Sequence, residues 1–148
     1  MELENIRESM DIKGFTAKYR FLSNFYASKI ILDGLEYKTV EAAYQAAKTD
    51  DPAARRRIRE AEKPGECKRL GQKVKLREDW EKNKLQAMED LVRQKFQNGE
   101  LREKLLATGD AYLEETNHWG DTFWGVCKAH GTNHLGKILM KVRNEIKK

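Results

Sequence analysis

The sequence predicts an α+β fold: a predominantly helical single domain with a small antiparallel sheet. Its 148 residues suit one domain that buries its own core. Apolar residues recur at helical spacing in several segments, and the turn dipeptide Asp33-Gly34 separates two short apolar runs of strand type. Because no repeat or linker interrupts the chain, we expect one domain over residues 15–148, preceded by a loosely ordered segment at 1–14.

The charge balance favours anionic ligands such as phosphates. Lys and Arg number 29 against 24 acidic residues, and this net charge of +5 is too small to establish a nucleic-acid binder. No apolar run approaches the length that crosses a bilayer, and the charged N-terminus has no signal-peptide pattern. We therefore expect a cytoplasmic protein with no membrane partner. Two cysteines, Cys67 and Cys127, are too few for a disulfide framework.

The first elements follow from turn and capping residues. The runs KIIL and LEY on either side of Asp33-Gly34 predict a β-hairpin. Thr39 is a suitable N-cap for a helix over VEAAYQAAK, which we expect to stop near Asp50-Asp51 because Pro52 disfavours a helical residue before it. Pro52 then suits the first position of the next helix, whose arginines at 55–59 are typical of a solvated face.

The later elements are predicted mainly from apolar periodicity. We expect Pro64-Gly65 to end the arginine-rich helix, and short helices to follow over ECKRLGQKV and LREKLLAT. The spacing of apolar residues from Asp79 to Phe96 predicts a long amphipathic helix. AYLEE has the pattern of a third strand, and Asn133 is a suitable N-cap for a final amphipathic helix.

A polar row on a helix made largely of alanine raises the question of function. At 3.6 residues per turn, Glu41, Gln45 and Lys48 fall on one line, while alanines and Tyr44 cover most of the remaining circumference. Glu41 and Gln45 can hydrogen-bond, whereas Lys48 is two turns from Glu41, too far for a direct ion pair. Two interpretations stay open: the row faces solvent, or it lines a pocket for a polar ligand.

Two further segments combine polar and aromatic residues. WGDTFWG places Asp121 before Trp124 in a glycine-rich loop, which suits either a ligand that stacks on indole rings or a turn that the aspartate caps. YRFLSNFY offers Arg20, Ser23 and Asn24 among aromatic side chains. This arginine either binds a phosphate or lies on the surface above a hydrophobic strand.

Several segments of the chain occur in an order that is typical of one family. They are FLSNFY, VEAAYQAAK, LGQKVKLREDWEKNKLQAM, KF, LLATGDAYLEE, DTFWG and GTNHLGKILMKVR. From about Phe21 to Arg143, nearly the whole chain resembles the YbiA-like, or NADAR, family. Ala42 departs from the pattern, because the family often has histidine after the glutamate of its EH..Q signature. Any role of that histidine is therefore absent or supplied elsewhere.

The resemblance implies an N-glycosidase, a hydrolase that cleaves the bond between a ribose carbon and a nitrogen. Members of this family act on phosphoribosylamino-pyrimidine intermediates of riboflavin biosynthesis, and others remove ADP-ribose from guanine bases. We expect the first activity here, with ADP-ribosyl hydrolysis on nucleic acid or nucleosides as the alternative. A non-catalytic module that binds ADP-ribose or a nucleotide is a second alternative, and the oligomeric state is not predicted.

A mechanistic hypothesis for this bond cleavage assigns roles to the polar residues. By analogy with two-carboxylate glycoside hydrolysis, Glu41 and Asp121 stand at the ribose and near the leaving base, in an order that stays open. Lys48 either holds a phosphate or attacks the ribose carbon and forms a Schiff base. The candidate substrate contacts are a phosphate-binding arginine, polar side chains and two stacking tryptophans: Arg20, Ser23, Asn24, Gln45, Asn133, Trp80 and Trp124.

Three of these assignments have ordinary structural alternatives. Trp80 also fits the apolar face of its helix, and Asn133 fits a helix cap. Cys127, His130 and His134 have a spacing that can bind zinc, but no fourth ligand is evident and a glycine interrupts the segment. We therefore expect neither a metal nor a cofactor.

Overall fold

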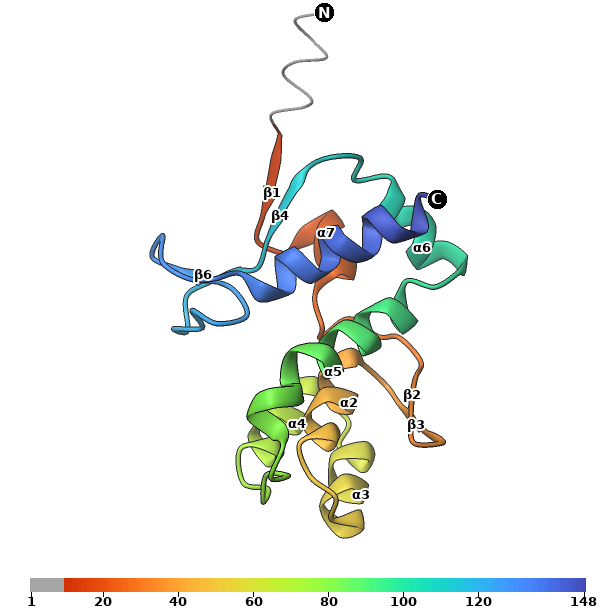
Figure 1. Cartoon of the computed structure of the whole chain (residues 1–148), viewed down its shortest axis with the longest axis vertical. Coiled ribbons are helices and arrows are strands. Elements are labelled where there is room, and N and C mark those ends of the chain that lie inside the picture. Colours follow the sequence, from red (N-terminus) through yellow and green to blue (C-terminus); the bar gives the residue numbers. More distant parts are fainter. Residues whose placement is uncertain (1–9) are drawn as a thin grey trace, which may run out of the picture. The chain divides into compact units, whose positions relative to one another are not determined.

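The computed structural model describes residues 10–148, which form two compact units (Figure 1). Unit 1 contains the described residues up to Ser23 together with Phe96–Lys148, and unit 2 contains Asn24–Lys95. The predicted class is confirmed, because helices predominate and the strands form two-stranded pairs, one of them antiparallel. That residues 15–148 form a single domain stays a prediction. No helix among residues 10–148 is long and apolar enough to cross a membrane.

The predicted hairpin opens unit 2. Strands β2 (Ile30–Leu32) and β3 (Leu35–Tyr37) pair antiparallel, with Ile30 opposite Tyr37. Asp33 and Gly34 join them with φ values of 49° and 82°, both in the left-handed region that a tight hairpin turn requires. The paired residues Ile30 and Tyr37 are fully buried, so this end of the hairpin belongs to the core of unit 2.

Helix α2 (Val40–Ala47) is the most deeply buried element of unit 2. Thr39 is its N-cap, as predicted, and its hydroxyl accepts a hydrogen bond from the Ala42 backbone N–H at 3.0 Å. All eight residues of the helix are buried, and α2 contacts α3 (Pro52–Glu60), α4 (Pro64–Gly71) and α5 (Trp80–Lys95). Figure 1 shows α2 among these three helices. Its alanines let the neighbouring helices approach on every side.

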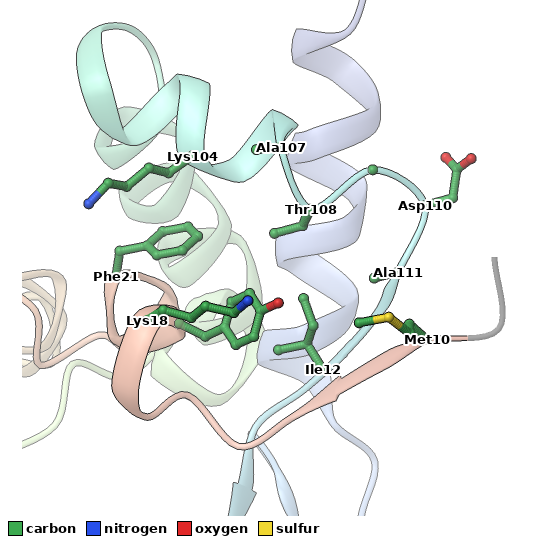
Figure 2. A pocket seen from close by; sticks show the side chains of 11 residues that line it. Met10, Ile12, Lys18, Phe21, Lys104, Ala107, Thr108, Asp110 and Ala111 are labelled. Carbon is green, nitrogen blue, oxygen red and sulfur yellow. The ribbon is translucent and has the colours of Figure 1, made fainter. Parts of the chain in front are cut away.

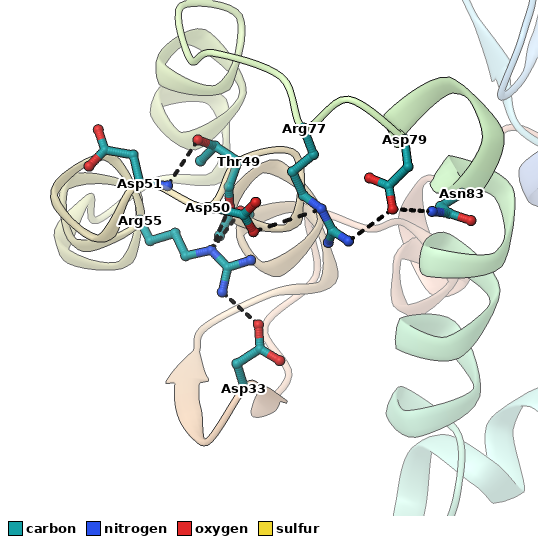
Figure 3. Close-up of polar contacts among 9 residues, drawn as sticks. Asp33, Thr49, Asp50, Asp51, Arg55, Arg77, Asp79 and Asn83 are labelled. Atoms are coloured by element: carbon teal, nitrogen blue, oxygen red, sulfur yellow. Dashed lines mark hydrogen bonds and ion pairs between the residues drawn. The ribbon is translucent and has the colours of Figure 1, made fainter.

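Arg55 holds the C-terminal end of α2. Its Nε atom donates hydrogen bonds to the backbone oxygens of Ala46 at 3.0 Å and Thr49 at 2.8 Å (Figure 3). Its Nη1 atom lies 2.6 Å from the Asp33 carboxylate. Arg55 therefore adds side-chain hydrogen bonds to the carbonyl groups at the end of the helix, where the regular intrahelical ladder stops. The interpretation of arginines 55–59 as a solvated face is wrong for this residue.

Other polar contacts fix the segments that flank α2. Pro52 begins α3, as predicted, with Asp51 as its N-cap. Pro64 begins α4, and the preceding helix already ends at Glu60. The Arg77 backbone N–H donates to the Lys48 carbonyl at 2.8 Å, which ties the entry to α5 to the end of α2. The Arg77 guanidinium also lies between two aspartates, Asp50 at 3.8 Å and Asp79 at 3.4 Å (Figure 3).

Unit 1 contains the remaining helices and the parallel strand pairs. Its helices are η1 (Ala17–Leu22), a 3-10 helix, α6 (Gly99–Leu106) and α7 (His134–Ile146), of which α7 packs on β4. Strand β1 (Asp11–Lys13) pairs with β4 (Tyr112–Glu114), and β5 (Thr116–Asn117) pairs with β6 (Val126–Cys127). Neither parallel pair was predicted. Of the expected loosely ordered segment 1–14, residues 1–9 lie outside the described residues, and 11–13 form β1.

Arg55→Lys should destabilise the protein by about 1–2 kcal/mol, because a lysine cannot reproduce the guanidinium contacts to the two carbonyls and to Asp33. Urea unfolding of the variant and the native protein measures the difference. Arg56→Lys is the matched control, since Arg56 is exposed on the same helix. Equal stability of the two variants would show that Arg55 does not hold the end of α2.

Candidate active site

The polar row of α2 lies inside unit 2. Glu41 is 8 % exposed and Gln45 is 4 % exposed, so the solvent-facing interpretation does not hold for these two residues. The Gln45 Nε2 atom donates a hydrogen bond to Glu41 Oε2 at 3.1 Å. An ionised carboxylate is stabilised by such a donor and by its place in the first turn of a helix, where the helix dipole favours negative charge.

The amide of Gln45 is fixed by close packing against α4. A methyl group at Gly71 would lie 1.9 Å from Gln45 Oε1, so the side chain occupies the space that a larger residue would take. Gln45 Oε1 is buried and accepts no hydrogen bond from the described residues. An unsatisfied buried acceptor typically costs about 1–3 kcal/mol, so this orientation needs a reason other than stability.

Lys48 is a half-buried cation close to Glu41. Burial lowers the pKa of the Lys48 amine; the charge of Glu41 raises it, and the charges of Lys68 and Lys84 lower it again. Its Nζ atom lies 5.6 Å from the centre of the Tyr44 ring. An amine of this kind can hold an anion, donate a proton or act as a nucleophile.

Two more predicted residues accompany this group in unit 2. Trp80 is buried, and its ring centre lies 5.2 Å from that of Tyr44 with the planes inclined by 53°. The Asn24 carbonyl accepts a hydrogen bond from the Glu41 backbone N–H at 3.1 Å. The Asn24 side chain donates to the sulfur of Met88 at 3.4 Å. The structure therefore brings together five of the ten predicted residues: Asn24, Glu41, Gln45, Lys48 and Trp80.

The other five predicted residues belong to unit 1. They are Arg20, Ser23, Asp121, Trp124 and Asn133. Asp121 Oδ1 accepts hydrogen bonds from the backbone N–H groups of Phe123 at 3.0 Å and Trp124 at 2.8 Å, so this carboxylate caps a turn. The Trp124 ring stands edge-on to Phe123, with centres 4.8 Å apart. Arg20 is exposed, as its surface alternative required.

Asn133 has a structural use inside unit 1. It stands at the N-cap position of α7, as predicted, but its φ of 57° is left-handed and its side chain does not cap the helix. Its amide nitrogen donates to the Leu113 carbonyl at 2.9 Å and to the Tyr112 hydroxyl at 3.3 Å. Its amide oxygen accepts from the Glu115 N–H at 3.0 Å. Every polar atom of this buried amide has a partner within unit 1, and a contact of Asn133 to a ribose hydroxyl stays a prediction.

A wide pocket of unit 1 lacks this chemistry. It has a volume of about 760 Å³, and Figure 2 shows the aromatic ring of Phe21 and the aliphatic chains of Ile12 and Met10 in its wall. Its carboxylate, Asp110, lies 2.7 Å from Lys147 in an ion pair. None of the ten predicted residues lines it. The candidate site is therefore identified by its charged groups and not by the size of a cavity.

A second buried lysine, Lys95, was not among the predicted residues. Lys95 is 5 % exposed, and burial lowers the pKa of its amine to about 7. Its Nζ atom lies 5.7 Å from the centre of the Tyr26 ring. The signal was present in the helical spacing, because Lys95 follows Met88 by two turns on the apolar face of α5. A lysine on the apolar face of α5 is an exception of the same kind as the polar row on the buried helix α2.

Comparison with known proteins identifies the family of this chain. The sequence model of the NADAR domain family matches residues 12–147. An N-glycosidase of Nostoc punctiforme is 42 % identical over 137 residues, covering 87 % of this chain and 86 % of that protein. The N-glycosidase YbiA of Escherichia coli is 38 % identical over 135 residues, covering 86 % of this chain and 82 % of YbiA.

Two further similarities concern a longer protein and a solved structure. A riboflavin biosynthesis protein of Vibrio vulnificus is 41 % identical over 130 residues, which cover 85 % of this chain. The chain spans only about a third, 35 %, of that protein. The NMR structure of E. coli YbiA superimposes with a TM-score of 0.81 and 36 % identity, covering 94 % of this chain and 86 % of that one.

Glu41→Gln should lower the pKa of the Lys48 amine further, because the variant removes the negative charge that raises it and leaves burial and the two neighbouring lysines in place. NMR titration of ¹³C-labelled lysine side chains measures the shift, with the Lys48 signal assigned by its loss in Lys48→Arg. Glu66→Gln is the control, because Glu66 is not among the charges that act on Lys48. An unchanged Lys48 titration in Glu41→Gln would place these two groups too far apart to cooperate.

Proposed function

Because the chain belongs to the NADAR domain family, we propose that it is an N-glycosidase that hydrolyses the ribosyl C–N bond of a phosphorylated ribosylamino-pyrimidine. The observation that carries the proposal is the pairing of a buried carboxylate, Glu41, with a half-buried amine, Lys48, on one helix. The names of the relatives, N-glycosidase and riboflavin biosynthesis protein, support the reaction and the class of substrate.

The reaction needs opposite charges at the two ends of the broken bond. Positive charge develops on the ribose and negative charge on the departing nitrogen, so a carboxylate stabilises the first and a proton donor the second. Glu41 suits the ribose, since its hydrogen bond from Gln45 and its place in the first helical turn both favour the ionised form. Asp121 remains the candidate for the second carboxylate of the reaction.

Lys48 has two roles that chemistry can separate. As a cation it holds the substrate phosphate. As a neutral amine it attacks the anomeric carbon of the ribose, the C–N bond breaks, and the bonding electron pair leaves with the nitrogen, which takes up a proton. The ring bond between C1 and its oxygen then breaks, the electron pair and an amine proton pass to that oxygen, and the opened sugar is an imine of Lys48. Water adds to the imine, releases the sugar as an aldehyde and restores the amine. The lowered pKa of Lys48 increases the neutral fraction that the second role requires.

The remaining contacts of the proposal serve binding. Trp80, which is buried against Tyr44, and Trp124 stay predicted stacking residues for the base, and Arg20 stays a predicted phosphate contact. Ser23 and Asn24 supply polar groups for the ribose. The same set would also accept ADP-ribose on a guanine base, because the phosphorylated ribose and the bond are shared. Such a substrate on nucleic acid is the alternative, and a module that binds without cleavage is the second alternative.

Incubation with a phosphoribosylamino-pyrimidine, with ADP-ribosylated guanosine and with NAD should release free base from the first compound, as measured by liquid chromatography. Glu41→Gln should lower kcat by about 10²–10⁴-fold with little change in substrate affinity, because it removes a charge that acts mainly in the transition state. Glu66→Gln, on an exposed residue, is the control. Release from ADP-ribosylated guanosine alone would select the alternative, and binding without release from any compound would overturn catalysis.

Borohydride added during turnover should fix the sugar to Lys48 as a secondary amine if the imine forms. Intact mass spectrometry and peptide mapping locate the adduct. Lys48→Arg separates the two roles, because arginine keeps the positive charge and loses the nucleophile. The imine route predicts no adduct and no turnover in Lys48→Arg, whereas substantial turnover in this variant assigns Lys48 to the phosphate.

A further inference from the structure

We propose that Gln45 is a positioning residue that holds the Glu41 carboxylate in its reactive orientation, and that glycine at position 71 exists to seat the Gln45 amide. The inference rests on the proposed function, because Glu41 needs a reaction to serve. In this inference α4 contributes no catalytic residue and acts on the reaction by fixing the Gln45 amide.

The hydrogen bond between the two side chains runs from the Gln45 amide to the Glu41 carboxylate. Gln45 Nε2 donates to Glu41 Oε2 at 3.1 Å, and both residues are nine-tenths buried or more. In a buried site a donor of fixed orientation restricts the carboxylate to one rotamer and favours its ionised form. Both properties are required of a carboxylate that stabilises a ribosyl cation.

This orientation of the Gln45 amide leaves its oxygen unsatisfied. Gln45 Oε1 is buried without a hydrogen-bond partner among the described residues. Turning the amide over would place this oxygen against the Glu41 carboxylate, so two acceptors would face each other and the donor would be lost. The structure therefore keeps the donor on Glu41 and leaves the oxygen unsatisfied. Such an exception among buried polar groups is expected where function and not stability selects the arrangement.

Helix α4 leaves space for this amide at Gly71. An added methyl group at Gly71 would meet three atoms of Gln45: Oε1 at 1.9 Å, the amide carbon at 2.6 Å and Cβ at 2.8 Å. Gly71 has an ordinary helical backbone, so a glycine is not needed there for conformation. A glycine inside a helix is otherwise unfavourable, and close packing on Gln45 is the reason for this one.

The same helix supplies a matched control. Gly65 lies in the first turn of α4, and a methyl group added there meets nothing within 4 Å. Gly65→Ala therefore changes the composition of α4 in the same way as Gly71→Ala without touching Gln45. Gln45→Leu removes the donor while keeping a side chain of similar bulk against Gly71.

The kinetic test compares these variants on the substrate that the native protein cleaves. Gln45→Leu and Gly71→Ala should each lower kcat about tenfold at unchanged KM, the size of effect expected for losing one charge-assisted hydrogen bond in the transition state. The acid limb of the pH profile should move to higher pH, because the ionised carboxylate loses a donor. Gly65→Ala should match the native protein.

A second measurement does not depend on any activity. The ¹H–¹⁵N signals of the Gln45 side-chain amide, assigned by their loss in Gln45→Leu, should shift as Glu41 titrates in the native protein, and this response should vanish in Glu41→Gln. Native protein that cleaves no substrate but shows this response would contradict the proposed function and leave the positioning contact in place. An amide signal that ignores Glu41, or a Gln45→Leu variant with native kcat and native pH profile, would overturn the inference even if Gly71→Ala does not fold.

Discussion

The structure of unit 2 depends on a hydrogen-bonded pair of polar side chains inside a helix that is buried on all sides. Glu41 and Gln45 lie in α2, where no residue from Val40 to Ala47 is exposed. Removing either partner would leave the other in a dry environment, a loss typically larger than the net worth of the bond itself. The alanines of α2 follow from the same constraint, because only small side chains let α3, α4 and α5 close around the pair.

Residues other than Lys48 supply the side-chain hydrogen bonds to the carbonyl groups at the end of α2. A cation near the last carbonyls of a helix usually satisfies them, and Lys48 follows the helix directly. Arg55 takes that task through its bonds to the Ala46 and Thr49 carbonyls, while Arg77 binds the Lys48 carbonyl through its backbone N–H. The Lys48 amine instead lies over Tyr44, within the field of Glu41. Burial is the main cause of the lowered pKa of the Lys48 amine.

Local rules predicted the elements whose causes are local. Asp33-Gly34, Thr39 and Pro52 each act on the residues beside them, and each appears in the structure as predicted. Strand β1 pairs with β4, a segment far away in the sequence, and no short pattern encodes such a register. Within the site, helical periodicity brought Glu41, Gln45 and Lys48 together. It could not reveal Gly71, because a glycine shows its purpose only when the side chain that packs on it is known.

The contacts of Asp121 bear on which group protonates the leaving base. Asp121 Oδ1 accepts two backbone hydrogen bonds, from Phe123 and Trp124. Glu41 likewise accepts a bond from Gln45 and stands at the positive end of a helix dipole. Each carboxylate therefore acts as a hydrogen-bond acceptor within its own unit. Lys48 differs, because a lowered pKa makes its ammonium a stronger acid than an ordinary lysine. For the proposed function this adds a third role of Lys48, as proton donor to the departing nitrogen, beside the phosphate contact and the nucleophile.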